Sequence, residues 1–194
     1  MELLVSICMG IGLAAACGLR VFLPLVALSV GTKLGIVTPG EGWEWIGSTA
    51  AVAGLSVAAV VEIGGYYIPW VDHALDALAT PLAVVAGAFA ALATMGMVSD
   101  LPPIVSHGAA LLTGGAAAGA VQVTSVAARS VSAVTTGGLL NPVVSTIENA
   151  VSAVLSFLAL VLPIIAGVVL LVIALLLVRR WTRQSRVKPV AAPA

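Results

Sequence analysis

The sequence has 194 residues, of which 61% are hydrophobic and only 8% are charged. Ordinary soluble domains carry about 25% charged residues, so this composition excludes a soluble fold that covers its own surface. With a mean hydropathy of +1.19, the sequence predicts an all-α, polytopic bundle of transmembrane helices whose solvent is the lipid bilayer.

The first predicted span runs from Leu3 to Val30 and is longer than the roughly 20 residues that a membrane-crossing helix needs. Gly18 and Pro24 interrupt it, so it is either one tilted helix or a broken one. Arg20 lies in its second half, close to these interruptions. An arginine near the end of a span can extend its guanidinium to the lipid headgroups, which is one explanation for Arg20.

The second and third spans are predicted at 46–63 and 80–98, where the sequence is again apolar. Trp43 and Trp45 precede the second span, as aromatic residues at a membrane interface do. The short stretch 71–79 between these two spans is more polar, and we expect it at the interface.

The fourth span, predicted at 104–136, is overlong and rich in glycine and alanine. Gly115 and Gly119 are spaced so that a second helix backbone can approach closely, either within the bundle or in a dimer. The last apolar segment, 141–178, begins with Asn141 as a helix cap, and Pro163 predicts a kink. We therefore predict five spans, or six if one long segment is a hairpin.

The predicted domain organisation is one transmembrane domain at 1–180 followed by a basic tail at 181–194, which we expect to be disordered. Basic residues gather where the last apolar run ends, so the positive-inside rule places the C-terminus in the cytoplasm. We expect a multi-pass protein of a bacterial cell membrane. Five spans then put the N-terminus and the stretch 71–79 outside.

Two short stretches are similar to each other and suggest an inverted repeat, an arrangement common in transporters. Ala16–Arg20 and Ser125–Arg129 each place an arginine late in a long, glycine- and alanine-rich span. Under the predicted topology these two spans enter the membrane from opposite sides.

Charged residues within apolar spans are costly, so each needs a partner, water or the interface. One interpretation is structural: Arg129 pairs with Glu62. The functional interpretation joins Arg20 and Arg129 at one polar cavity that binds an anion, because a guanidinium donates two parallel hydrogen bonds to a phosphate or carboxylate. Glu62 or Glu148 would release the anion or carry a proton, and Asn141 lies at the break before Glu148.

A second polar group consists of Asp72, His73 and Asp76, which share one face of a helix. Carboxylate and imidazole are ordinary ligands of divalent metals. The competing interpretation is a solvated, capping group at the membrane interface. Whether a metal binds here stays open from the sequence alone.

Signatures of the familiar enzyme classes are missing from the sequence. It has no HExxH motif, no phosphate-binding loop between a strand and a helix, and no serine, histidine and aspartate in a known local context. We therefore expect no cofactor and do not favour an enzyme, although a membrane enzyme with an unfamiliar site stays open.

Four stretches resemble the bacterial family of small polytopic membrane proteins catalogued as domain of unknown function four-one-two-six. They are Gly18-Leu19-Arg20-Val21-Phe22-Leu23-Pro24, Ile68-Pro69-Trp70-Val71-Asp72-His73-Ala74-Leu75-Asp76, Thr135-Thr136-Gly137-Gly138, and Asn141-Pro142 with Ser145 and Glu148. The resemblance implies no activity or substrate. It directs attention to Arg20, Asp72, His73, Asp76, Asn141 and Glu148.

We expect a small transporter or channel-like protein for an anionic small molecule or a phospholipid headgroup, working as a homo-oligomer. No nucleic acid is expected as a partner, because the basic residues flank an apolar run. The alternative is a non-catalytic scaffold or assembly partner that packs through small-residue helix faces, with the Gly115 and Gly119 face exposed to a partner helix.

Overall fold

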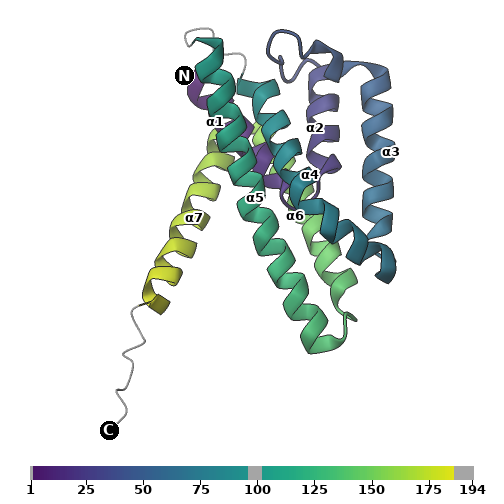
Figure 1. Ribbon diagram of the computed structural model, residues 1–194. Coiled ribbons are helices and arrows are strands. Elements are labelled where there is room, and N and C mark those ends of the chain that lie inside the picture. The colour runs from purple at the N-terminus through teal and green to yellow at the C-terminus, as the bar shows by residue number, and fades with distance from the viewer. Residues whose placement is uncertain (1, 96–101, 186–194) are drawn as a thin grey trace.

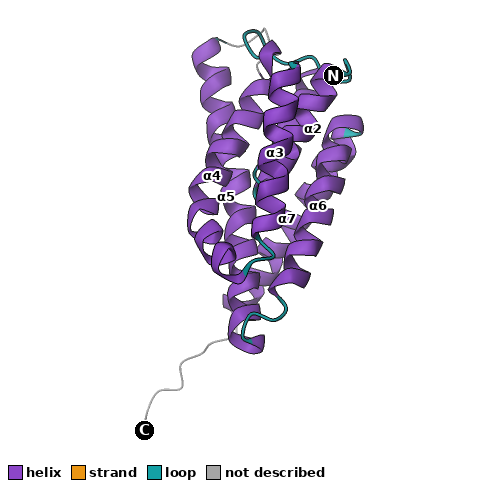
Figure 2. Ribbon diagram, turned by 90° about the vertical axis from the view of Figure 1, so that its right-hand side faces the viewer, coloured by secondary structure: helices purple, strands orange, loops and turns teal. Residues whose placement is uncertain are grey.

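The computed structural model describes residues 2–95 and 102–185, and the predicted all-α class is confirmed for them (Figures 1 and 2). Several helices lie side by side and form one elongated bundle. The elements are α1 (Glu2–Cys17), α2 (Phe22–Lys33), the short 3-10 helix η1 (Glu44–Gly47), α3 (Thr49–Gly65), α4 (Pro69–Met95), α5 (Pro103–Thr136), α6 (Asn141–Val161) and α7 (Pro163–Ser185).

Among the described residues, three helices are long and apolar enough to cross a membrane, fewer than the five spans predicted. These helices are α4, α5 and α6. The difference arises because the first predicted span divides into two helices that are both too short, and because α3 has only 17 residues. The last predicted span also divides, but its first part, α6, is long enough to be counted. Composition alone does not distinguish one long apolar helix from two short ones.

The first predicted span divides at Gly18–Val21 into α1 and α2. A Cβ added at Gly18 would collide with the carbonyl oxygen of Ala118 in α5, so this position requires glycine. In Figure 1 the N-terminus and the loop after α2 lie at the same end of the bundle, so α1 and α2 form a hairpin. The 12 residues of α2 rise about 18 Å, less than the roughly 30 Å of a hydrocarbon core. We call residues 18–21 the hairpin tip.

Helix α1 lies at the centre of the bundle, in contact with α4, α5, α6 and α7. Leu13, Ala14, Ala16 and Cys17 in its second half have no exposed surface. The small alanine side chains let the neighbouring helices approach α1 closely. This packing holds the hairpin tip inside the protein.

The last predicted span divides at Leu162, where the backbone leaves the helical region (φ −134°, ψ 60°). Pro163 follows and has no N–H to continue the helical hydrogen bonds. In Figures 1 and 2, α6 and α7 diverge from this bend like the two arms of a V, where the sequence predicted only a kink. Helix α7 continues to Ser185, so the first residues of the tail predicted at 181–194 are helical; residues 186–194 lie outside the described part.

Helix α4 is continuous from Pro69 to Met95 and includes the stretch 71–79 that the sequence placed at an interface, before a third span at 80–98. Residues 96–98 of that predicted span lie outside the described part. Pro81 is accommodated within the helix. The acidic residues of this stretch thus belong to the first turns of a long helix.

Helices α4 and α5 pack so closely that several glycines are required. A Cβ added at Gly114 would lie 2.5 Å from the carbonyl oxygen of Gly87, and Cβ atoms added at Gly115 and Gly119 would lie 3.3 Å and 3.2 Å from the side chain of Val84. The Gly115 and Gly119 face therefore packs on α4 of the same chain. The prediction that this face is open to a partner helix is wrong.

The contact between Gly114 and Gly87 predicts a stability difference between two glycine substitutions. Gly114→Ala should destabilise the protein by about 1–3 kcal/mol, because the added methyl group forces α4 and α5 apart. Gly54→Ala in α3 is the matched control: no atom lies within 4 Å of the added Cβ, and alanine favours a helix over glycine by about 1 kcal/mol. Thermal unfolding in detergent measures both. Equal shifts in Tm would contradict the close packing of α4 on α5.

Candidate functional site

A cluster of buried charged and polar side chains lies where the hairpin tip meets the end of α3, the start of α4, the second half of α5 and the start of α6. Arg20 and Arg129 are 1% and 3% exposed although they are charged. The charged cluster, as we call it, consists of Arg20, Glu62, Tyr66, Asp72, Asp76, Arg129, Asn141, Ser145 and Glu148.

The carboxylate of Glu148 is shared by both arginines. Nη1 of Arg20 lies 3.0 Å from Oε2 of Glu148. Nε of Arg129 donates to the same oxygen at 3.2 Å, and its Nη2 also contacts that oxygen. The hydroxyl of Ser125 donates to Oε1, so the carboxylate has a partner on each oxygen. Glu148 thus joins the hairpin tip to α5 through α6.

The remaining donors of Arg20 bind groups at the start of α6 and in its own loop. Nη2 donates to the backbone carbonyl of Ser145 at 3.1 Å, and Nε donates to the side-chain oxygen of Asn149. Nη1 donates to the carbonyl of Leu19 at 2.9 Å. Because this guanidinium is buried and multiply bonded, the interpretation that Arg20 extends to the lipid headgroups is wrong.

The other side of Arg129 binds two aspartates of α4. Nη1 lies 2.6 Å from Oδ1 of Asp72 and 3.4 Å from Oδ1 of Asp76. The second oxygen of Asp72 accepts a hydrogen bond from Nδ2 of Asn141 at 3.0 Å. Oδ1 of Asn141 is buried and accepts no hydrogen bond from the described residues. Asp72 is 2% exposed, so the interpretation of this residue as a solvated interfacial group is wrong.

The ring of Tyr66, at the end of α3, contacts both arginines. The guanidinium carbons of Arg20 and Arg129 each lie 4.1 Å from the centroid of this ring. The negative face of an aromatic ring attracts a cation, and the attraction is larger where water is excluded. Tyr66, itself 4% exposed, therefore stabilises two neighbouring cations that otherwise repel each other.

Glu62 binds the start of α2. Its two carboxylate oxygens accept hydrogen bonds from the backbone N–H groups of Val21 and Phe22, at 2.7 Å and 2.9 Å. A carboxylate is stabilised there because a helix N-terminus leaves N–H groups unpaired and carries partial positive charge. The structural interpretation that Glu62 pairs with Arg129 is not what the geometry shows, because Arg129 pairs with Asp72, Asp76 and Glu148.

The described side chains of the charged cluster contain more acidic than basic groups. Arg20 and Arg129 supply two positive charges, whereas Glu62, Asp72, Asp76 and Glu148 supply four carboxyl groups. If every group is ionised, these six carry a net charge of −2. A buried net charge is costly in a medium of low dielectric.

The structure brings together every residue predicted for the anion site, namely Arg20, Arg129, Glu62, Glu148 and Asn141. Asp72 and Asp76 join them, whereas the side chain of His73 lies outside the described part. Among the described residues, no three histidine, cysteine, aspartate or glutamate side chains lie close enough to hold a metal ion. The sequence did not predict Tyr66, Ser125, Ser145 or Asn149 as site residues, although Ser145 belongs to a stretch that resembles the family and Ser125 begins the second of the two similar stretches.

The two stretches behind the predicted inverted repeat differ in conformation. Ala16–Arg20 leaves the end of α1 and enters the hairpin tip, whereas Ser125–Arg129 is helical throughout. Their arginines converge on one carboxylate from different kinds of backbone. The repeat itself stays a prediction.

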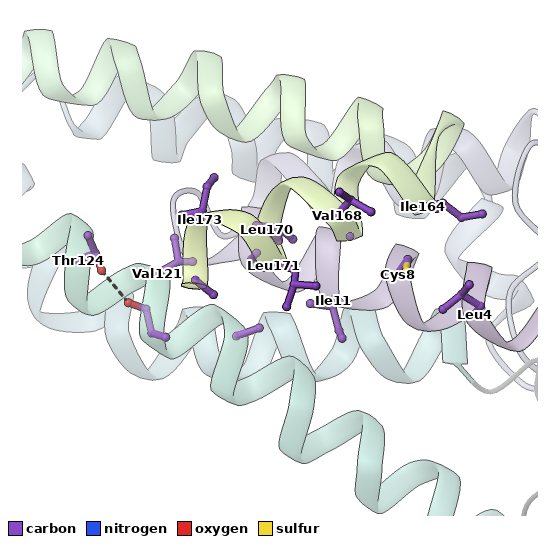
Figure 3. Close-up of a pocket in the computed structure, with 15 residues that line it drawn as sticks. Leu4, Cys8, Ile11, Val121, Thr124, Ile164, Val168, Leu170, Leu171 and Ile173 are labelled. Atoms are coloured by element: carbon purple, nitrogen blue, oxygen red, sulfur yellow. Dashed lines mark hydrogen bonds between the residues drawn. The ribbon is translucent and has the colours of Figure 1, made fainter. Parts of the chain in front are cut away.

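A separate groove of about 610 Å³ lies between α1, α5 and α7. Figure 3 shows Leu4, Cys8 and Ile11 of α1 facing Val168 and Leu171 of α7 across it. Its hydroxyl-bearing residue, Thr124, donates to the carbonyl of Ala120 at 3.0 Å. The described residues that line the groove are uncharged and mostly apolar.

The fold and the charged cluster define an all-α bundle with three helices able to cross a membrane and two buried, paired arginines. The chain belongs to the family described as domain of unknown function (DUF4126), whose model matches residues 7–183. This confirms the resemblance predicted from the sequence. The match includes every residue of the charged cluster, and the family's description names no activity. Comparison with curated proteins and with solved structures gave no match.

The ion pairs of Arg129 predict a large loss of stability on substitution. Arg129→Gln should destabilise the protein by about 3–5 kcal/mol, because it removes the cation that pairs with the buried Asp72 and one of the two cations that pair with Glu148. Lys33→Gln is the control, since the exposed Lys33 donates to the hydroxyl of Thr49 at 2.8 Å at the surface. Thermal unfolding in detergent compares them. A similar Tm for both variants would rule out the buried ion pairs as a major source of stability.

The contacts of Tyr66 predict that its ring matters and its hydroxyl does not. Tyr66→Leu should destabilise the protein by about 2 kcal/mol or more, because both cation–π contacts are lost. Tyr66→Phe keeps the ring and should change stability little. Chemical or thermal unfolding separates the two variants, and equal losses would show that the ring contacts with the arginines contribute nothing.

Proposed function

We propose that this protein is a small multi-pass carrier in a cell membrane, whose substrate is an anion bound by Arg20 and Arg129. The supporting observation is that both guanidiniums, from elements more than 100 residues apart, converge on the single carboxylate of Glu148. That carboxylate occupies the position that a substrate anion would take. The site is therefore built to hold a negative group between two cations.

The chemistry of the guanidinium favours a phosphate or a carboxylate as the substrate group. Its planar fork donates parallel hydrogen bonds to two oxygens of such a group, and these bonds are stronger where water is excluded. A buried arginine in a membrane protein is expensive and usually marks a pathway for substrate or ions. Two of them in contact with one carboxylate favour a functional role over simple anchoring.

The surface of the bundle fits a membrane. Large apolar side chains are exposed on the outer faces of several helices, including Val60 and Val61 of α3, Leu112 of α5 and Leu171 of α7. Lipid would cover these faces. The α1–α2 hairpin is then a re-entrant element, and its non-helical tip is tolerated because it is buried in protein.

A re-entrant hairpin that carries a substrate-binding residue at its tip suits alternating access, because carriers commonly bind substrate where helices are broken. The hairpin tip positions Arg20, and Glu62 holds the first N–H groups of α2. Movement of this hairpin relative to α5 and α6 would open or close the contact between Arg20 and Glu148.

The basic end of α7 favours a cytoplasmic C-terminus, as the sequence predicted. In Figure 1 the turn between α5 and α6 lies toward the same end of the bundle as the end of α7. The charged cluster then lies in the cytoplasmic half of the protein. The sequence analysis placed Asp72 and Asp76 outside the cell. The proposed side is the opposite one, because the chain reverses direction once more at Leu162, between these residues and the C-terminus, than a five-span count allows.

The alternative function, a non-catalytic scaffold, loses its main support because the Gly115 and Gly119 face packs inside the chain. It predicts that the charged cluster is a fixed structural network. It also predicts that substitutions of Arg20 change stability without changing the movement of any solute.

Reconstitution into proteoliposomes tests the carrier. One arm measures uptake of inorganic phosphate from solution, and a second measures transfer of phosphatidic acid between leaflets, so the arms distinguish a free phosphate from a lipid headgroup. Arg20→Lys should reduce the rate of transport of whichever probe the wild-type protein moves by about 10–100-fold, because loss of a charged hydrogen bond costs about 1.5–3 kcal/mol. Lys33→Gln should match the wild type.

Folding of each variant is checked by gel filtration and Tm before transport is compared. Failure of the wild-type protein to move either probe would overturn the proposal. So would unchanged transport by Arg20→Lys, since the lysine keeps the charge but lacks the planar fork.

A further inference from the structure

We propose that Glu148 couples the substrate to protons: each anion displaces the Glu148 carboxylate from the two arginines, and one proton binds to Glu148 when this happens. The inference rests on the proposed carrier function. It goes beyond that function by naming the coupling ion, the residue that binds it and the stoichiometry.

Geometry singles out Glu148 among the acidic groups of the charged cluster. Among the described residues it is the one carboxylate whose ion pairs reach both Arg20 and Arg129. Glu62 is engaged by the backbone N–H groups at the start of α2, and Asp72 is held by Arg129 and Asn141. An anion that binds both arginines therefore competes directly with Glu148.

The charges explain why a proton must accompany the anion. The two arginines already face four carboxyl groups, so an arriving anion adds negative charge to a site with no spare cation among the described side chains. Buried uncompensated charge is costly in a medium of low dielectric. If one proton binds Glu148 as one monovalent anion binds the arginines, the net charge of the cluster does not change.

The exchange is balanced atom by atom. A proton from water forms an O–H bond on a carboxyl oxygen of Glu148, and the N–H···O bonds from both guanidiniums pass from Glu148 to the anion. The hydroxyl of Ser125, which donates to Glu148 in this structure, can turn to accept the new O–H. On release of the anion the proton leaves, and the carboxylate returns to the arginines.

The pH at which this exchange occurs is a property of the whole charged cluster. Among the described side chains, Arg20 from the hairpin tip and Arg129 from α5 contact Glu148 directly. Asp72 and Asp76 of α4 and Tyr66 at the end of α3 contact one or both of these arginines, and Glu62 of α3 binds the hairpin tip. A change of charge on any of these groups acts on the others across a medium of low dielectric, so the exchange depends on the whole cluster. Substitution of Glu148 is therefore the sharper test.

The experiment drives transport with a pH difference. The solution outside the proteoliposomes is more acidic than the solution inside. The probe is the one that the wild-type protein moves, either inorganic phosphate added outside or phosphatidic acid in the bilayer. With one proton per anion, the wild-type protein should accumulate the probe about tenfold per unit of pH difference. Glu148→Gln mimics the protonated carboxyl, so it should move the probe downhill but show no accumulation driven by the pH difference.

Glu41→Gln is the matched control, because it makes the same substitution at an exposed loop residue and should behave like the wild-type protein. The same pH difference is applied to every variant, so the protonation of the probe is the same in all samples and does not account for a difference between variants. Accumulation by Glu148→Gln equal to that of the wild type would overturn the inference while leaving the carrier intact. Absence of transport by the wild-type protein would overturn the carrier function itself.

A second measurement needs no variant and covers the case in which Glu148→Gln does not fold. Inorganic phosphate is added to the wild-type protein in weakly buffered detergent solution with a pH indicator, and a protein-free sample corrects for the phosphate. The solution is kept acidic enough that free phosphate is already the monoanion, so protonation of the phosphate itself takes up no proton on binding. Saturation should then coincide with uptake of about one proton per bound anion by the protein. Binding of phosphate with no proton uptake would overturn the coupling.

Discussion

The arrangement of this bundle depends on one carboxylate, that of Glu148, which pairs with two buried arginines. Buried charges are stable only when partners neutralise them and bond their remaining donors. Arg20 meets this requirement through α6, and Arg129 meets it through α4 and α6. The hairpin tip, α4, α5 and α6 must therefore meet at one place, and α3 joins them through Tyr66 and Glu62. The ends of the helices follow from that meeting point as much as from hydrophobic packing.

The broken first span is a direct consequence of this constraint. In a continuous helix, the backbone N–H groups next to Arg20 would bond to carbonyl groups of the preceding turn. Glu62 would then find no free N–H group from which to accept a hydrogen bond. The break at the hairpin tip frees the N–H groups of Val21 and Phe22, and Glu62 binds them. One glutamate thus offsets the cost of unpaired backbone inside an apolar bundle.

Several residues of the charged cluster could be predicted from the sequence, but the contacts among them could not. Arg20, Arg129 and Glu148 are visible because charge is rare in this chain. The prediction that Asn141 caps the last helix is wrong: Leu140 is the N-cap of α6, no side chain caps it, and the amide of Asn141 donates to Asp72 instead. The hairpins were not predictable, since apolar residues fill one long helix and two short ones equally well. Tyr66 carried no signal for a site in the sequence. Its role between two guanidiniums exists only once α3, α5 and the hairpin tip are packed together.

The excess of acidic groups among the described side chains favours the proposed proton-coupled transport over a purely structural role for the charged cluster. A network selected for stability alone would match its charges, because each uncompensated buried carboxylate costs several kcal/mol or takes up a proton. Here Asp76 lies at the outer part of the cluster with its side chain 25% exposed, while Glu148 and Asp72 are almost fully buried. The acidic groups thus extend from a partly accessible position to the carboxylate shared by the arginines. Under the proposed coupling, the partly exposed Asp76 is the place where a proton would enter the cluster, because it and Glu148 both contact Arg129.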